Sequence, residues 1–182
     1  MFDPTAFENI RVVLEGIFYD KDLAGELIII DRNDTINTAK LSRIYDVSFQ
    51  LQPSEIINEP KITCKITIEA KLQNLSAELL PSLRTKNEAG CIFFSEFIFE
   101  HEKDEFFLKQ IESILKETWK KVKIKQTVVY EPFKRGKKME HHGFLEFNQL
   151  LTEDHMNDLP DIAQQIVETL MQMEVVLNRS NE

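Results

Sequence analysis

The chain has 182 residues, of which 42% are hydrophobic and 29% charged, and its net charge is −9 at pH 7. These proportions predict one soluble folded domain over residues 1–182 and exclude a disordered chain. No apolar run approaches the length of about 18 residues that a membrane helix needs, and the opening MFDPTAFENI has no basic region followed by an apolar core. We therefore expect a cytoplasmic protein with no membrane partner.

The first half of the chain predicts a helix followed by three strands. Apolar residues recur at helical spacing over residues 4–20, the run ELIII follows at 26–30, and RIYDVSFQL at 43–51 alternates in polarity. Residues 61–72 alternate most regularly. One face is expected to carry Ile62, Cys64, Ile66, Ile68, Ala70 and Leu72, and the other Thr63, Lys65, Thr67, Glu69 and Lys71.

The second half predicts three helices and three further strands. In order we expect a short helix at 76–80, a strand at 91–100, a helix at 104–122, strands at 123–133 and 143–147, and a closing helix at 160–177. Because apolar residues occupy both faces of the strand at 91–100, we expect it to be central and covered on both sides. The two cysteines, Cys64 and Cys91, are expected to be reduced and partly buried.

These elements define the expected fold. The order α-β-β-β-α-β-α-β-β-α, with short connections between the early strands, predicts an α+β domain. Its sheet is expected to be mainly antiparallel, with about six strands and with helices packed on one side.

Several kinds of chemistry are excluded by spacing. The five glycines, at positions 16, 25, 90, 136 and 143, allow neither a dinucleotide-binding turn nor a phosphate loop nor a nucleophile elbow. No histidine pair has zinc-site spacing, and adjacent His141 and His142 should point to opposite faces of a strand. We expect no metal site and no cofactor.

One catalytic alternative remains. Asp46 on the second strand, with Glu69 and Lys71 on the polar face of the third, resembles the acid plus Glu-x-Lys arrangement of restriction-enzyme-type nucleases. In that family the carboxylates hold Mg²⁺ while the lysine positions the attacking water. The resemblance implies a Mg²⁺-dependent nuclease-like domain. A solvated strand face with cross-strand charge pairs explains the same residues without catalysis.

A basic segment stands out in an acidic chain. Residues 116–138 hold nine lysines and arginines against two glutamates, and they include Lys120, Lys121 and the loop residues Lys134, Arg135, Lys137 and Lys138. The loop could contact a nucleic-acid backbone, but the net negative charge opposes approach to a polyanion. An acidic protein surface, or a second copy of this chain, is the partner that both signs of charge favour.

The last predicted helix adds a candidate surface at Met171 and Met173, because methionine adapts to irregular partners. The element order also resembles that of small acidic secretion chaperones, although the helix at 104–122 departs from it. Together these features predict a non-catalytic, adaptor-like or chaperone-like protein-binding module that works as a dimer or in a larger assembly.

Overall fold

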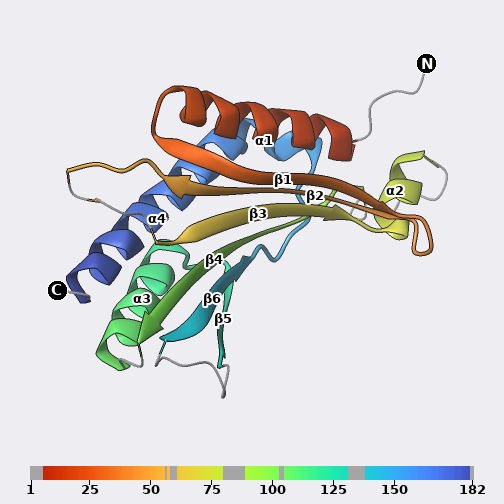
Figure 1. The fold of residues 1–182 in the computed structure, drawn as a ribbon. Coiled ribbons are helices and arrows are strands. Elements are labelled where there is room, and N and C mark those ends of the chain that lie inside the picture. Colours follow the sequence, from red (N-terminus) through yellow and green to blue (C-terminus); the bar gives the residue numbers. More distant parts are fainter. Residues whose placement is uncertain are drawn as a thin grey trace.

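The computed structural model describes residues 6–55, 57, 61–79, 89–102, 105–130 and 138–180 (Figure 1). The helices are α1 (Ala6–Leu23), α2 (Leu72–Leu79), α3 (Glu105–Thr118), the 3-10 helix η2 (Glu153–Asp158) and α4 (Leu159–Ser180). The strands are β1 (Leu27–Asn37), β2 (Ser42–Leu51), β3 (Thr63–Ala70), β4 (Ile92–Glu102), β5 (Lys123–Val129) and β6 (Lys138–Glu146). The predicted α+β class and element order are confirmed, with η2 added before the last helix.

All six strands form one open sheet in the order β1-β2-β3-β4-β6-β5, and every pair is antiparallel (Figure 1). Strands β1 to β4 are neighbours in the sheet in the same order as in the sequence. Helix α3 then carries the chain to the far edge, where β5 forms, and β6 fills the place between β5 and β4. Strands β1 and β5 are therefore the two edges.

The core lies between one face of this sheet and the helices α1, α3 and α4. Val47, Ile66 and Leu145, which belong to one register line across the sheet, are at most 2% exposed. Helix α1 adds Phe7, Ile10, Leu14 and Phe18 at helical spacing, and Phe18 stacks on Phe49 with ring centroids 4.8 Å apart. The apolar residues that alternate along the strands and those that recur at helical spacing on α1 therefore pack together in one core layer.

Helix α4 is tied to the start of β3 by a buried carboxylate. Glu174 Oε1 accepts hydrogen bonds from the backbone N–H groups of Lys61 and Ile62, at 2.7 and 2.6 Å. The Glu174 side chain is fully buried, and this burial raises its pKa although the two N–H groups act in the opposite direction. Two backbone donors that precede the strand are thereby satisfied by the last helix.

Several expectations about elements need correction; besides the three below, the strand predicted at 143–147 begins earlier, at Lys138, and the helix predicted to end at residue 122 ends at Thr118. The strand predicted at 61–72 ends at Ala70, because Lys71 N donates to Asn74 Oδ1 and Asn74 N donates to Lys71 O, which turns the chain into α2. Leu72 is consequently 51% exposed instead of buried on the strand face, and the short helix begins at Leu72, earlier than predicted. Residue 4, the predicted start of the first helix, lies outside the described residues.

The third correction concerns β4, which is central but not covered on both sides. Phe93, Phe97 and Phe99 are buried against the helices, whereas Ile92 and Phe94 on the opposite face stay partly exposed. Within the described ranges, no helix packs over that opposite face.

The free thiols of Cys64 and Cys91 are fully buried, deeper than expected. None of the described helices is long and apolar enough to cross a bilayer.

Candidate binding surfaces

The face of the sheet turned away from α1, α3 and α4 is a broad surface that mixes apolar and charged side chains. We call it the helix-free face. Its members alternate with the core residues along each strand, and directly paired residues of an antiparallel ladder lie on the same side. The residues used below are Asp31, Asp46, Ser48, Thr63, Lys65, Thr67, Glu69, Ile92, Phe94, Glu96, Ile98, Glu140, His142, Phe144, Glu146, Lys123 and Lys125.

The three nuclease-like residues gather at one part of the helix-free face. Asp46 pairs in register with Thr67, so Glu69 lies diagonally across from it on β3, and Lys71 follows the end of that strand. Asp46 is only 7% exposed, and its Oδ1 lies 3.2 Å from Lys65 Nζ and 3.1 Å from Asn33 Nδ2. The Lys71 and Glu69 charges are 4.0 Å apart. Each carboxylate therefore already has a lysine beside it.

A hydrogen-bonded histidine bridges two carboxylates near the centre of the same face. His142 Nδ1 lies 2.6 Å from Glu96 Oε1, and His142 Nε2 lies 2.7 Å from Glu140 Oε1. Partial burial alone lowers the pKa of His142, but the hydrogen bonds to Glu96 and Glu140 outweigh it and raise the pKa overall. A protonated ring donates to both carboxylates at once.

The neighbouring histidine, His141, points to the helix side and into an aromatic cluster. Its ring stacks on Phe99 at 4.7 Å between centroids, and its Nε2 lies 3.0 Å from Gln126 Oε1. Burial, with smaller contributions from His101 and His142, lowers the pKa of His141 to about 4. The predicted opposite orientation of the two adjacent histidines is confirmed.

The predicted basic residues Lys120 and Lys121 border a hollow of about 670 Å³ where α3 ends. Both side chains are exposed. The hollow is lined by the apolar residues Trp119, Val122, Phe147 and Ile162, by the amides of Asn148, Gln149 and Gln165, and by Glu117 and Thr118. Trp119 packs edge-on against Phe147 with centroids 5.7 Å apart and donates its indole N–H to Thr169 Oγ1 at 3.1 Å.

The remaining predicted binding residues are not brought together. Met171 is 48% exposed on α4, but Met173 is fully buried in the core, so Met173 offers no surface and is dropped from the candidates. A helix turns by about 100° per residue, which is why two methionines so close in sequence face different environments. The described residues do not include Lys134, Arg135 and Lys137. Lys138 is the first residue of β6, but the structure does not describe its side chain.

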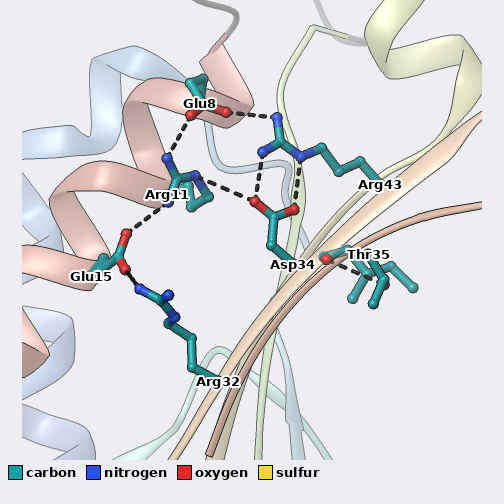
Figure 2. A network of polar contacts seen from close by, with 8 residues as sticks. Glu8, Arg11, Glu15, Arg32, Asp34, Thr35 and Arg43 are labelled. Carbon is teal, nitrogen blue, oxygen red and sulfur yellow. Dashed lines mark hydrogen bonds and ion pairs between the residues drawn. The ribbon is translucent and has the colours of Figure 1, made fainter.

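Sequence inspection missed a network of charges that joins α1 to the β1–β2 hairpin, shown in Figure 2. Arg43 holds Asp34 through two hydrogen bonds of 2.6 and 2.9 Å and reaches Glu8 at 2.6 Å. Arg11 contacts Glu8 and Glu15, and Arg32 also contacts Glu15 (Figure 2). The signal in the sequence is the spacing of Glu8, Arg11 and Glu15 at one helix face.

The Arg contacts lower the pKa values of two acids of the network, Glu8 and Asp34. Hydrogen bonding from Arg11, followed by Arg43, lowers the pKa of Glu8 against the opposing effect of burial. Hydrogen bonding from Arg43 lowers the pKa of Asp34 in the same way. Arg43 also lies 4.9 Å over the Phe7 ring. Since every member has a partner on an adjacent element, the network fastens α1 to the hairpin and leaves no unpaired charge directed at a ligand.

The fold and these surfaces define an α+β protein whose six-stranded antiparallel sheet is covered by helices on one side. Searches of protein-family models, of curated proteins and of solved structures find no match for the chain. Among the described residues, no group of three or more histidine, cysteine, aspartate or glutamate side chains is arranged to hold a metal ion.

Proposed function

We propose that this chain is a non-catalytic protein-binding module and that it takes an acidic, partly apolar polypeptide segment at the hollow beside Lys120 and Lys121. The observation that carries the proposal is that exposed lysines and apolar side chains occur together at this hollow. Two exposed lysines border a hollow that is also lined by four apolar residues and three side-chain amides, with Glu117 as its one acidic lining residue among those described. Binding sites of this composition anchor an apolar group while charge complementarity sets its orientation.

The charges at the end of α3 favour an acidic partner. Lys116 is paired with Glu112 at 2.5 Å and Lys123 with Glu146 at 2.8 Å. Lys120 and Lys121, by contrast, have no carboxylate within ion-pair distance in the part of the chain that the structure describes. An incoming glutamate or aspartate side chain would therefore meet two available ammonium groups instead of displacing an existing contact.

The backbone that presents these lysines is held from two sides. Gln165 of α4 donates its amide N–H to Thr118 O at 3.1 Å, and Asn148, which follows β6, donates to Lys121 O at 3.0 Å. The two amides thus satisfy the carbonyl group of Thr118, which precedes the lysines, and that of Lys121 itself. A turn held in this way loses little conformational entropy when a partner binds.

We prefer this function to the nuclease-like alternative because of the surroundings of Asp46. Its carboxylate is nearly buried and already contacts Lys65 and Asn33. Metal binding at Asp46 would have to replace both contacts. The buried thiols offer no better catalytic group, since burial raises the pKa of Cys64 well above its usual value and keeps it as an unreactive thiol.

Trp119 is the single tryptophan of the chain, so its fluorescence reports directly on the hollow. We would titrate the full chain with a synthetic peptide in which glutamate alternates with leucine and phenylalanine, and with the same peptide carrying lysine in place of glutamate. The acidic peptide should change the Trp119 emission with an affinity that falls as salt is added, whereas the basic peptide should not.

The matched variants carry the same change of charge at different places. Lys120→Glu with Lys121→Glu should weaken binding of the acidic peptide at least tenfold. Lys40→Glu with Lys109→Glu, at exposed lysines away from this hollow, should leave it within about twofold. Equal losses in both double variants, or no emission change with the acidic peptide, would overturn the proposal.

A further inference from the structure

The central register line of the helix-free face has an ordered pattern of charge. One residue from each strand lies on this line, which we call the central row: Asp31, Ser48, Lys65, Glu96, Phe144 and Lys125, in sheet order. Read across the sheet, the charges run negative, neutral, positive, negative, neutral, positive. The second half of the row repeats the first half, so reversing the row places each charge opposite one of the other sign.

We propose that two copies of this chain associate face to face through their helix-free faces, related by a two-fold axis that runs parallel to the strands between β3 and β4. Such an axis reverses the strand order of the second copy. Strand β1 then faces β5 of the second copy, β2 faces β6, and β3 faces β4. This dimer uses a different surface from the Lys120 and Lys121 hollow and does not depend on it.

The reversed row is complementary in charge at each of its charged positions. Asp31 faces Lys125 of the second copy, and Lys65 faces Glu96 of the second copy; symmetry repeats both pairs. A two-fold axis perpendicular to the strands would instead place β1 over β1, with Asp31 against Asp31 and Lys65 against Lys65. The charge pattern therefore selects one of the two face-to-face arrangements.

The same reversal pairs large side chains with small ones near the axis. Phe94 and Thr67 share a register line, as do Ile98 and Thr63. In the dimer, Phe94 faces Thr67 of the second copy and Ile98 faces Thr63 of the second copy. Phe144 similarly faces Ser48 of the second copy. Alternation of large and small residues allows two sheet faces to interdigitate at the spacing of about 10 Å seen in packed sheets.

One facing pair is alike in charge, and each member already has a counter-ion. The register line beside the central row brings Asp46 opposite Glu146 of the second copy. Asp46 contacts Lys65 at 3.2 Å, and Glu146 contacts Lys123 at 2.8 Å, within one chain. These contacts offset the repulsion between the two carboxylates.

The area of the face is somewhat below that of one side of a standard protein interface. Five strand spacings of about 4.8 Å give a width of roughly 24 Å, and eight residues at about 3.4 Å give a length of roughly 27 Å. That area approaches the roughly 800 Å² that each partner buries in a standard protein interface. Sheets that pack face to face cross at about 30°, so the pairs nearest the axis, Lys65 with Glu96, keep their positions best.

The test uses the outer pair, because Asp31 and Lys125 are exposed and can be changed without disturbing the core. We would measure the mass of the full chain by sedimentation equilibrium at low salt over a range of concentrations. The unchanged protein should reach twice the 21.3 kDa of one chain. Asp31→Lys and Lys125→Asp should each weaken self-association at least tenfold, since each places like charges at both symmetry-related positions.

The decisive measurement is a mixture of the two single variants. One copy with Asp31→Lys and one copy with Lys125→Asp present opposite charges at both outer positions, so the mixture should form a dimer about as well as the unchanged protein. Lys40→Asp, which makes the same change outside the face, should not alter the mass. A monomer at all concentrations, a dimer insensitive to both variants, or a mixture that fails to associate would overturn the proposal.

Discussion

At the scale of single residues, two adjacent histidines show how strongly a strand separates environments. His141 lies among aromatic rings on the helix side, and His142 lies between Glu96 and Glu140 on the helix-free face. The alternation of the strand predicts their opposite directions. Glu140 lies two residues before His142 on β6, so the same alternation predicts its position, whereas Glu96 lies on the paired strand β4 and only the register could identify it.

We expect the two rings to titrate far apart. In an NMR titration of the imidazole protons, His141 should titrate near pH 4 because its ring is buried, and His142 should titrate above 6.5 because two carboxylates stabilise its charged form. Glu96→Gln should lower the His142 midpoint and leave that of His141 unchanged. Coincident midpoints near 6.5 would show that neither environment exists in solution.

The same shifts fix the sign of their effects on stability. Below about pH 6.5 the unfolded chain protonates His141 while the folded chain does not, so the free energy of unfolding falls as the pH drops toward 4. His142 acts oppositely, because its stabilising contribution is complete below about pH 6.5 and is lost as the pH rises through its folded pKa. The two effects have opposite signs because burial lowers the pKa of His141, whereas the carboxylate partners raise the pKa of His142.

At the scale of elements, the ion network between α1 and the β1–β2 hairpin connects parts that helix and strand periodicity predict separately. Periodicity identifies both elements, and the i, i+3 and i, i+4 spacing on α1 identifies the contacts of Arg11. The contacts of Arg43 with Asp34 and Glu8 need the tertiary arrangement, because nothing local brings β2 to α1 (Figure 2).

Removal of Arg43 should therefore cost more than removal of another arginine of the network. Arg43→Ala should lower the free energy of unfolding by about 1–2 kcal/mol, since it removes contacts with two acids and with the Phe7 ring. Arg32→Ala is the matched control. Arg32 is half exposed and contacts only Glu15 within the network, so its loss should cost below about 0.5 kcal/mol. Urea unfolding at pH 7 measures both, and equal costs would contradict this role of Arg43.

At the scale of the whole molecule, the sequence predicts the order of elements and the core face of the sheet. Alternation places Ile62, Cys64, Ile66, Ile68 and Ala70 on that face, and all five are buried. The error at β4 has a physical origin. Ile92 and Phe94 are as apolar as buried residues, and no pattern within one strand tells whether a helix or solvent lies above them.

The candidate sites could be predicted only in part. The basic segment directs attention to Lys120 and Lys121, but the hollow beside them is built from residues after β6 and on α4 that share no motif. The central row likewise depends on the register of five strand pairs. Distant residues meet there because of the ladder, not because of their spacing in the sequence.

One glycine fixes where the segments before β4 and after β6 meet. Gly90 has a φ of +143°, and a Cβ atom there would lie 2.5 Å from Leu151 O, which accepts the hydrogen bond of Cys91 N. Gly90→Ala should therefore lower the free energy of unfolding by about 2–3 kcal/mol. Gly16→Ala is the control, because a Cβ at this position in α1 contacts nothing within 4 Å.

The control should shift stability in the other direction. Alanine at position 16 removes the backbone entropy that glycine loses in a helix, so Gly16→Ala should raise the free energy of unfolding by about 0.5–1 kcal/mol. Thermal unfolding of both variants gives the comparison. A neutral Gly90→Ala would mean that the contact between the Gly90–Cys91 segment and Leu151 does not form in solution.

The position of α4 has a consequence for how the chain is made. Every strand of the sheet precedes residue 159, whereas Ile166, Leu170 and Leu177 of α4 complete the layer that covers it (Figure 1). A ribosome therefore completes α1, α3 and every strand before α4, and the part of the apolar side that α4 covers stays open until this helix emerges. During that interval this part of the core is accessible to water, to other nascent chains and to the cell's folding factors.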